Sequence, residues 1–264
     1  MGTDLFAVAQ FLKLRIMGHT QESISADLTE LGVVSGDILF VHSSYKSLGQ
    51  VDGGPKTVIK ALEDAVGNTG LILMPAFHLI DRPLRHKLWD FYTTPSTVGW
   101  LTEYFRRMTG TFRSDHYSHS VAGRGKDAES FVSQHRSFIG RRSPWDLDPW
   151  GRTFGSNSPM HRAYNREGKL LMIGTDYDTC TYIHLVEVIH WNQRLEKDDS
   201  AAFNAIHRPV VGDYWDSSGS VVRGSVGDSD CRLFQIRQFI DEMVIETGEN
   251  PQPYWRDYWP QLSS

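Results

Sequence analysis

Hydrophobic residues in the first third of the chain form short continuous runs, separated by segments with helical spacing. Residues 37–41 and 71–74 are two such runs, and both are typical of strands buried on both faces. Between them, Pro55 suits the first turn of a helix, and the apolar residues after it recur at intervals of three or four. Strand, helix and strand in this order predict a βαβ unit with parallel strands.

The rest of the chain alternates between the same two patterns. Helices are predicted at residues 6–17, 21–31, 97–108, 181–195 and 230–247, a strand at 169–173, and alternating strands at 210–226 around a Ser218-Gly219 turn. No internal repeat or long flexible linker is evident, so residues 1–264 are predicted to form one domain. The predicted fold class is α/β, with a mixed, largely parallel central sheet flanked by helices. A smaller α+β elaboration is expected after the helix at 181–195.

Composition narrows the class of protein. The 264 residues include 27 Lys and Arg against 32 Asp and Glu, which gives a formal net charge of −5. That charge, without a basic stripe, argues against a nucleic-acid partner and favours a small cationic substrate. Cys180 and Cys231 cannot build a disulfide framework, so the reduced cytoplasm is the expected location. The longest apolar run, residues 71–80, is shorter than the ~20 residues of a membrane span. The amino terminus also lacks signal-peptide features.

Three polar residues with helical spacing are the strongest candidates for chemistry. Thr181, His184 and Glu187 are spaced i, i+3 and i+6, directly after the strand at 169–173. This spacing places a hydroxyl, an imidazole and a carboxylate near one face of a helix. Histidine can accept and return a proton near neutral pH, and open α/β sheets carry their chemistry where a strand leads into a helix. The alternative is a helix whose His and Glu simply face solvent.

Two loops add further candidates. The loop at 42–49 follows a strand and precedes a helix, so its hydroxyls and free N–H groups could hold a phosphate or an extended amide-bearing chain. It matches neither a P-loop nor a dinucleotide fingerprint, and an ordinary polar loop is the alternative. In the second loop, His116 and His119 could bind zinc, but no third ligand follows at a typical spacing. Cys180 precedes His184 by four residues, which suits either a nucleophile pair or simple packing.

These motifs, in this order, resemble the aminoglycoside 3-N-acetyltransferases, over about residues 28–239. The segments that carry the resemblance are Val41-His42-Ser43-Ser44, Gly49, Gly53-Gly54, Gly70, Met74-Pro75, Thr94-Pro95-Ser96, Gly99, Glu103-Tyr104-Phe105-Arg106-Arg107, Arg113-Ser114-Asp115-His116, His119-Ser120-Val121-Ala122, Gly125, Phe154-Gly155, Ser158-Pro159 and Thr181-x-x-His184-x-x-Glu187. Two positions depart from the family pattern: Tyr117 replaces a usual Pro, and Gly123 stands where a second Ala is common.

The resemblance implies an N-acetyltransferase that uses acetyl-CoA as co-substrate, needs no metal, and acts on a small-molecule amine such as an aminoglycoside or a related amino sugar. His184 would be the general base, oriented by Glu187 or by Asp230 or Asp228, and Thr181 would donate to the oxyanion or the sulfur. The residues expected to line the coenzyme are His42, Ser43, Ser44, Tyr45, Lys46, Ser47, Ser114, His116, Ser118, His119, Ser120 and Val121. Those expected at the amine are Phe77, Asp90, Asp228 and Glu187, with Asp213, Asp216 and Asp230 nearby.

Other functions stay open at this point. Within the same chemistry, the acceptor could be an amino sugar of polysaccharide or natural-product biosynthesis. A metal-dependent hydrolase using His116, His119 and His184 is a different class, and a catalytically inactive binding protein is a third. The sequence does not determine the amine, the length of the acyl chain or the oligomeric state. A homodimer is one assembly that the sequence allows.

Overall fold

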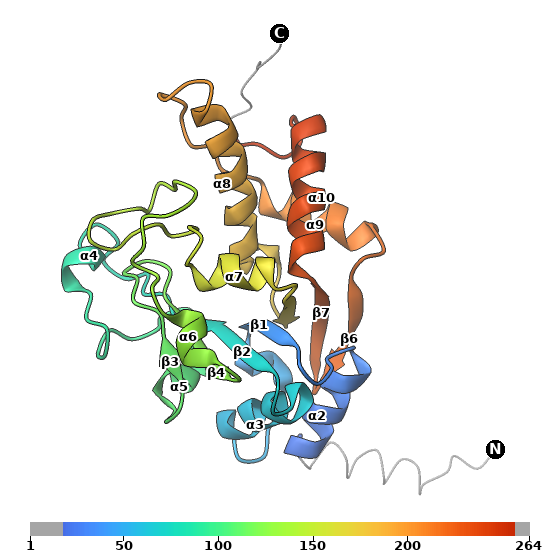
Figure 1. Cartoon of the computed structure of the whole chain (residues 1–264). Helices are drawn as coiled ribbons and strands as arrows, with labels where there is room; N and C mark the ends of the chain where they lie inside the picture. The colour runs from blue at the N-terminus through green and yellow to red at the C-terminus, as the bar shows by residue number, and fades with distance from the viewer. Residues whose placement is uncertain (1–17, 257–264) are drawn as a thin grey trace, which may run out of the picture.

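A seven-stranded sheet in the order β3-β4-β2-β1-β5-β7-β6 organises the structure (Figure 1). The computed structural model describes residues 18–256, so the helix predicted at 6–17 lies outside the described residues. The strands are β1 (Ile38–Ser43), β2 (Leu71–Pro75), β3 (Phe112–Arg113), β4 (Val121–Gly125), β5 (Lys169–Ile173), β6 (Val222–Val226) and β7 (Ser229–Gln235). The helices are α2 (Gln21–Glu30), α3 (Pro55–Val66), α4 (Arg85–Leu88), α5 (Trp100–Arg107), α6 (Ala128–Val132), α7 (Pro159–Asn165), α8 (Thr181–Leu195), α9 (Arg208–Ser217) and α10 (Ile236–Glu249), with short 3₁₀ helices η1 (Tyr45–Leu48) and η2 (Tyr177–Thr179).

The βαβ prediction is confirmed, but the sheet is less parallel than expected. Strand β1 pairs in parallel with β2 and with β5, and α3 connects β1 to β2. The pairings β2–β4, β3–β4, β5–β7 and β6–β7 are antiparallel. The sheet is therefore mixed but not largely parallel. Hydrophobic runs report that a strand is buried and do not report its direction.

The central strands are apolar on both faces because helices cover both sides. On β5, Leu170 and Met172 pack with α8 and α10, whereas Leu171 and Ile173 join the core that α2 and α3 cover. Figure 1 shows α8 and α10 on one side of the sheet and α2 and α3 on the other. Successive residues of a strand face opposite sides, so a continuous apolar run is what this position requires.

The segment after α8 departs from the predicted elements. The strands predicted at 210–226 begin as helix α9, in which Val211 and Trp215 are buried at helical spacing, and only β6 remains as a strand. The helix predicted at 230–247 begins only at Ile236, because the residues before it form β7, which pairs with β5 and β6 and makes a hairpin through Gly227, with φ of 56°. This segment extends the central sheet and is not a separate elaboration. Pairing with β5 overrides the local pattern here.

Gly123 has a structural reason for departing from the family pattern. It lies on β4, where an added Cβ would come within 2.9 Å of Val132 Cγ1 and 3.2 Å of Leu73 Cδ2. Those distances are shorter than normal contacts, so α6 packs closely on the sheet because this residue has no side chain.

Candidate active site

A cavity of about 540 Å³ lies at the carboxyl edge of the parallel strands, beside the amino terminus of α8. The residues that line it are His42, Pro75, Phe77, Leu79, Arg82, Arg85, Thr97, Val98, His119, Trp145, Asp178, Thr179, Thr181, His184 and Arg208. In an open α/β sheet, this edge is where ligands bind, because the loops after the parallel strands converge there.

His184, which lines this cavity, forms a hydrogen bond with Glu187. Nδ1 of His184 lies 2.6 Å from Oε2 of Glu187, and the His184 side chain is 21% exposed whereas that of Glu187 is 1% exposed. The other carboxylate oxygen, Oε1, accepts a hydrogen bond of 2.9 Å from the backbone N–H of Ile206. The spacing of three residues on α8 brings the two side chains together, as the sequence predicts. Glu187 is buried behind the imidazole and does not line the cavity, which corrects its predicted contact with the amine.

Arg208 lies against the other side of the same imidazole. Its Nη2 is 2.7 Å from Nε2 of His184, and its Nη1 donates to the backbone carbonyl of Asp178. A guanidinium can only donate, so Nε2 of His184 accepts and the imidazole proton resides on Nδ1, where Glu187 accepts it. In this arrangement, the lone pair on Nε2 of His184 points at the Arg208 guanidinium.

Aromatic rings surround the imidazole. The Trp145 ring lies 4.7 Å from the His184 ring at an interplanar angle of 64°, and the His119 ring lies 6.1 Å away. Phe77 packs on His119 at 4.9 Å, and both side chains line the cavity. The Tyr117 hydroxyl donates to the Trp145 carbonyl at 2.8 Å, so this departure from the family pattern anchors the loop that carries Trp145.

His42 supplies a buried polar atom without a partner. Its side chain lines the cavity, it is 5% exposed, and Nε2 has no hydrogen-bond partner among the described residues. Burial lowers the pKa of His42 to about 4, so the ring is neutral at physiological pH. An unsatisfied buried nitrogen is costly unless a ligand or water pairs with it. His42 therefore marks this part of the cavity as a binding surface.

Most residues predicted to hold the coenzyme do not line this cavity. Within the loop at 42–49, His42 alone does so, because Ser44 to Ser47 turn away through η1, and Ser47 Oγ bonds to the Ser44 carbonyl and to Ser229 Oγ. Of the second predicted segment, His119 alone lines the cavity. The predicted coenzyme residues that lie elsewhere are Ser43, Ser44, Tyr45, Lys46, Ser47, Ser114, His116, Ser118, Ser120 and Val121.

The buried members of the second segment hold the loop together. Ser114 Oγ accepts from the Val121 N–H at 2.8 Å, and Ser120 Oγ donates to the Ala76 carbonyl at 2.7 Å. Arg113 also reaches the Ala76 carbonyl, at 2.7 Å, and stacks on the Trp89 ring. Because these groups already form hydrogen bonds inside the protein, they maintain the conformation of the loop.

Contacts within its own loop and with Thr153 hold the His116 ring in place. Its Nδ1 accepts from the backbone N–H groups of Ser118 and His119, each at 3.2 Å, and its Nε2 lies 3.3 Å from Thr153 Oγ1. Both ring nitrogens are thus engaged. Among residues 18–256, no group of three or more His, Cys, Asp or Glu side chains is arranged to hold a metal ion. The geometry gives no support to a hydrolase built on His116, His119 and His184.

The predicted acidic residues also lie away from His184. Asp228 and Asp230 line a separate shallow depression that meets the cavity only at Thr179, and Asp228 pairs with His19 at 3.1 Å. Asp230 is therefore not the partner of His184, a role that Glu187 fills. Asp90 stabilises a turn by accepting from the backbone of Tyr92 and Thr93.

Asp216 and Asp213, the other predicted acidic residues, also do not line the cavity. Asp216 is tied to Arg223, Arg232 and Tyr177, so its carboxylate is already neutralised by protein groups. Asp213 lies on α9 and does not line the cavity. The acidic cluster seen in the sequence therefore does not form one wall of the cavity.

Cys180 is buried at the start of α8 and is poorly suited to nucleophilic attack. It is fully buried, and burial raises the pKa of its thiol to about 11. A thiol with such a pKa carries little thiolate at neutral pH, and the thiolate is the reactive form. The packing interpretation of Cys180 therefore holds.

Several cavity residues were not found from the sequence. Arg82, Arg85, Trp145, Asp178 and Arg208 come from irregular segments or helix ends, where hydrophobic periodicity gives no signal. Only the Pro-, Trp- and Asp-rich composition around Trp145 indicates an ordered loop. Asp146 builds that loop, because its carboxylate accepts from Ser143 and from Thr153 N.

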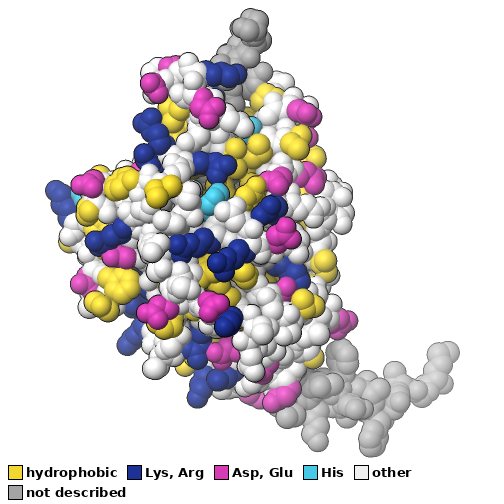
Figure 2. Space-filling view, viewed as in Figure 1, with side chains coloured by type: hydrophobic (Ala, Val, Ile, Leu, Met, Phe, Trp, Pro, Cys, Tyr) yellow, Lys and Arg dark blue, Asp and Glu magenta, His cyan; other side chains and the backbone are white. Residues whose placement is uncertain are grey.

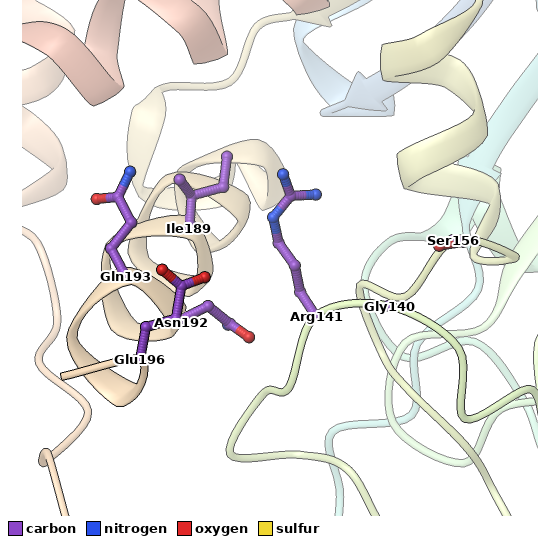
Figure 3. A pocket seen from close by; sticks show the side chains of 7 residues that line it. All are labelled: Gly140, Arg141, Ser156, Ile189, Asn192, Gln193 and Glu196. Atoms are coloured by element: carbon purple, nitrogen blue, oxygen red, sulfur yellow. The ribbon is translucent and has the colours of Figure 1, made fainter. Parts of the chain in front are cut away.

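A second depression of about 430 Å³ lies farther along α8 (Figure 3). Ile189, Asn192, Gln193 and Glu196 form its α8 side, and the Arg141 side chain extends toward the helix from the facing loop. It contains none of the predicted site residues. Figure 2 shows Lys and Arg side chains spread across the middle of the face that carries α7 and α8, although the net charge is negative.

Comparison with known proteins assigns the chain to a family. Residues 40–245 match the family model described as aminoglycoside 3-N-acetyltransferase. The chain belongs to this family. It is 30% identical over 258 residues to the SPbeta prophage-derived aminoglycoside N(3')-acetyltransferase-like protein YokD of Bacillus subtilis (strain 168), an alignment covering 84% of this chain and 90% of that protein. It is 26% identical to aminoglycoside N(3)-acetyltransferase VII of Streptomyces paromomycinus, covering 84% and 89%. The protein is thus an aminoglycoside 3-N-acetyltransferase-like enzyme.

Solved structures of this acetyltransferase family share its fold. The YokD structure superposes with a TM-score of 0.71 at 25% identity, covering 89% of this chain and 96% of that one. AAC-IIIb bound to CoASH gives 0.70 at 22% identity, covering 92% and 100%. A mutant of AAC(3)-IVa bound to gentamicin gives 0.71 at 23% identity, covering 90% and 91%. Between residues 18 and 256, the acetyltransferase has no helix long and apolar enough to cross a membrane.

Proposed function

We propose that this protein transfers an acetyl group from acetyl-CoA to an amine of an aminoglycoside or a related amino sugar, with His184 as general base. The observation that carries the proposal is that His184, held by the buried Glu187, lines a cavity at the carboxyl edge of the sheet in a member of an acetyltransferase family. An amine attacks a thioester only as its neutral form, so a base that faces the cavity is what the reaction needs.

The reaction proceeds by direct attack. The amine loses a proton to Nε2 of His184 as its nitrogen bonds to the thioester carbon. The resulting oxyanion collapses, the carbon–sulfur bond breaks, and the imidazolium returns the proton to the departing CoA sulfur. Glu187 accepts from Nδ1 throughout and stabilises the imidazolium, as a carboxylate does beside a catalytic histidine. The products are an acetamide and CoASH.

Thr181 and the start of α8 suit the oxyanion. Thr181 is the first residue of a 15-residue helix, and it lines the same cavity as His184. Its hydroxyl and the positive end of the helix favour negative charge that develops near them.

Acetyl-CoA is the expected donor. The cavity size suits the acetyl and pantetheine end of the coenzyme better than the whole molecule, and the neutral His42 offers Nε2 to an amide of that arm. A relative of the same fold has been solved with CoASH. The high pKa of the buried Cys180 thiol supports transfer without an acyl-enzyme.

A thiol-release screen tests this function. Acetyl-CoA is mixed with the protein and with gentamicin, apramycin, sisomicin or glucosamine, and free CoASH and acetylated product are measured together. We expect amine-dependent thiol release matched by a product one acetyl group heavier. Release that does not depend on any amine would indicate thioester hydrolysis instead. No release with any amine would support the inactive binding protein.

A further inference from the structure

Arg208 donates a hydrogen bond to Nε2 of His184, the atom that has to act as the base. Its Nη2 lies 2.7 Å from Nε2 of His184, so the lone pair that would accept the amine's proton already accepts a hydrogen bond. An acceptor amine can reach Nε2 only if the guanidinium moves or if the acceptor itself pairs with it. Arg208 is therefore part of the surface that the acceptor meets.

The protein fixes Arg208 in this place through the same carboxylate that orients the base. Glu187 binds His184 through one oxygen and the backbone of Ile206 through the other, and Ile206 precedes Arg208 by two residues. Arg208 is the first residue of α9, and its Nη1 is also held by the Asp178 carbonyl. These contacts hold the guanidinium against the imidazole when no acceptor is bound.

The charged side chains of the cavity are mostly basic. Arg82, Arg85 and Arg208 line it, and Asp178 is the one carboxylate among the described lining residues. The other candidate acids, Asp228 and Asp230, face the neighbouring depression. A polycation placed with one amine at His184 would bring further ammonium groups toward arginines, which like charges disfavour in a partly enclosed site.

We infer that the acceptor carries an acidic group, a carboxylate or a phosphate, close to its reacting amine, and that Arg208 recognises this group. The inference rests on the proposed acetyl transfer and narrows its acceptor to amino sugars that carry an acidic group, in place of the polycationic aminoglycosides. Pairing with the acidic group draws the guanidinium off Nε2, which frees the lone pair for the amine. Arg208 thus determines specificity, because an amine without an acidic group leaves the guanidinium on the base.

The phosphates of the coenzyme are not the anion for Arg208. In acetyl-CoA, the whole pantetheine arm separates the phosphates from the thioester, whereas Arg208 touches the imidazole at the reacting end. An acidic group that reaches Arg208 must therefore belong to the acceptor. Arg82 and Arg85 line the cavity from the segment around α4, and the Arg85 guanidinium packs over the Tyr117 ring at 5.3 Å.

Calorimetric binding to matched amino sugars tests this inference. Glucosamine, glucosamine 6-phosphate and muramic acid share an amino sugar and differ in whether they carry an acidic group. The protein should bind at least one anionic sugar about 10- to 100-fold more tightly than glucosamine, as a charge-assisted hydrogen bond to Arg208 permits. Arg208→Met should remove this preference, and Arg208→Lys should keep part of it. Arg141→Met, in the second depression, is the matched control and should bind like the unmodified protein.

Several results would overturn the inference. Equal or weaker affinity for both anionic sugars, tighter binding of gentamicin, or an unchanged preference in Arg208→Met would each do so. A fall in kcat of Arg208→Met by the same factor for every acceptor would assign Arg208 to the oxyanion instead. Thiol release reports the proposed function separately: anion-selective binding without release would refute acetyl transfer alone, and release without selectivity would refute this inference alone.

Discussion

Glu187 lies 2.6 Å from Nδ1 of His184 while its second oxygen holds the backbone of Ile206. One buried carboxylate thus orients the proposed base and anchors the segment that delivers Arg208 to the opposite side of the same ring. His184, Glu187 and Arg208 therefore form one hydrogen-bonded unit. A substitution of any one of them should change the geometry of the other two.

Replacing Glu187 with Gln tests that unit. The amide nitrogen of Gln would donate a hydrogen bond to Nδ1 of His184. The imidazole proton would then reside on Nε2 and point at the N–H groups of Arg208. The proton acceptor is lost, so we expect kcat to fall between about 10- and 10⁴-fold while acetyl-CoA affinity changes little. Steady-state kinetics with the best acceptor and calorimetry with CoA measure the two effects. A kcat within twofold of the unmodified enzyme would mean that Glu187 does not orient the base.

Tyr117 should act on catalysis through Trp145. Tyr117→Phe removes the 2.8 Å hydrogen bond to the Trp145 carbonyl, and Trp145 packs on His184. One net hydrogen bond contributes about 1 kcal/mol, so we expect a loss of roughly fivefold in kcat/KM for the amine. Tyr92→Phe is the control, because the Tyr92 side chain is exposed and does not line the cavity. Equal kinetics in the two variants would show that the Tyr117 anchor does not matter.

Cys180→Ala should retain most of the activity, since the buried thiol has a pKa of about 11 and direct transfer does not use it. The matched measurement is mass spectrometry of the protein after mixing with acetyl-CoA and before adding amine. We expect no acetyl adduct at Cys180. An adduct that disappears on addition of the amine would establish a two-step route through this residue.

The buried histidines should make the fold sensitive to acid. Burial lowers the pKa of His42 and of His135 to about 4, from an ordinary value of 6.5 that the unfolded chain regains. Between pH 6.5 and 4, the unfolded state therefore binds more protons than the folded state, and the free energy of unfolding falls as the pH falls. Each such proton contributes a slope of about 1.4 kcal/mol per pH unit within that window.

Urea unfolding at several pH values between 7 and 4.5 measures this dependence. His135→Gln should flatten it, although its loss of the bonds to Ser114 and Thr153 lowers stability at pH 7. His207→Gln, at an exposed position, is the control and should leave the slope as it is. An identical slope in His135→Gln and in the unmodified protein would contradict the assignment of His135 as a neutral buried residue.

The sequence predicts the frame of the molecule well because its frame depends on local patterns. The strand at Lys169–Ile173 and the helix at Thr181–Leu195 follow from hydrophobic spacing, and the structure confirms them. The strand β7 and the helix α9 could not be predicted, since pairing with β5 and burial of Trp215 decide them. Such tertiary contacts are absent from a local pattern.

The candidate site likewise contains residues whose contacts the sequence predicts and residues whose contacts it does not. His184, Glu187 and Thr181 share one helix, so their spacing alone brings them together. Arg208 contacts the imidazole from 24 residues farther along the chain, and Trp145 contacts it from a loop upstream. Hydrophobic periodicity does not predict contacts between segments that are far apart in the sequence. Motif order identified the family, yet many motif residues, such as His116 and Ser120, support the loop and do not face the cavity.

The most direct test of the account is acetyl transfer by His184→Ala with the best acceptor from the thiol-release screen. We expect a turnover lower by about 10²- to 10⁴-fold, the usual contribution of a positioned base, with unchanged CoA affinity and a folded protein by circular dichroism. Turnover close to that of the unmodified enzyme in the folded variant would remove His184 from the mechanism and contradict the account.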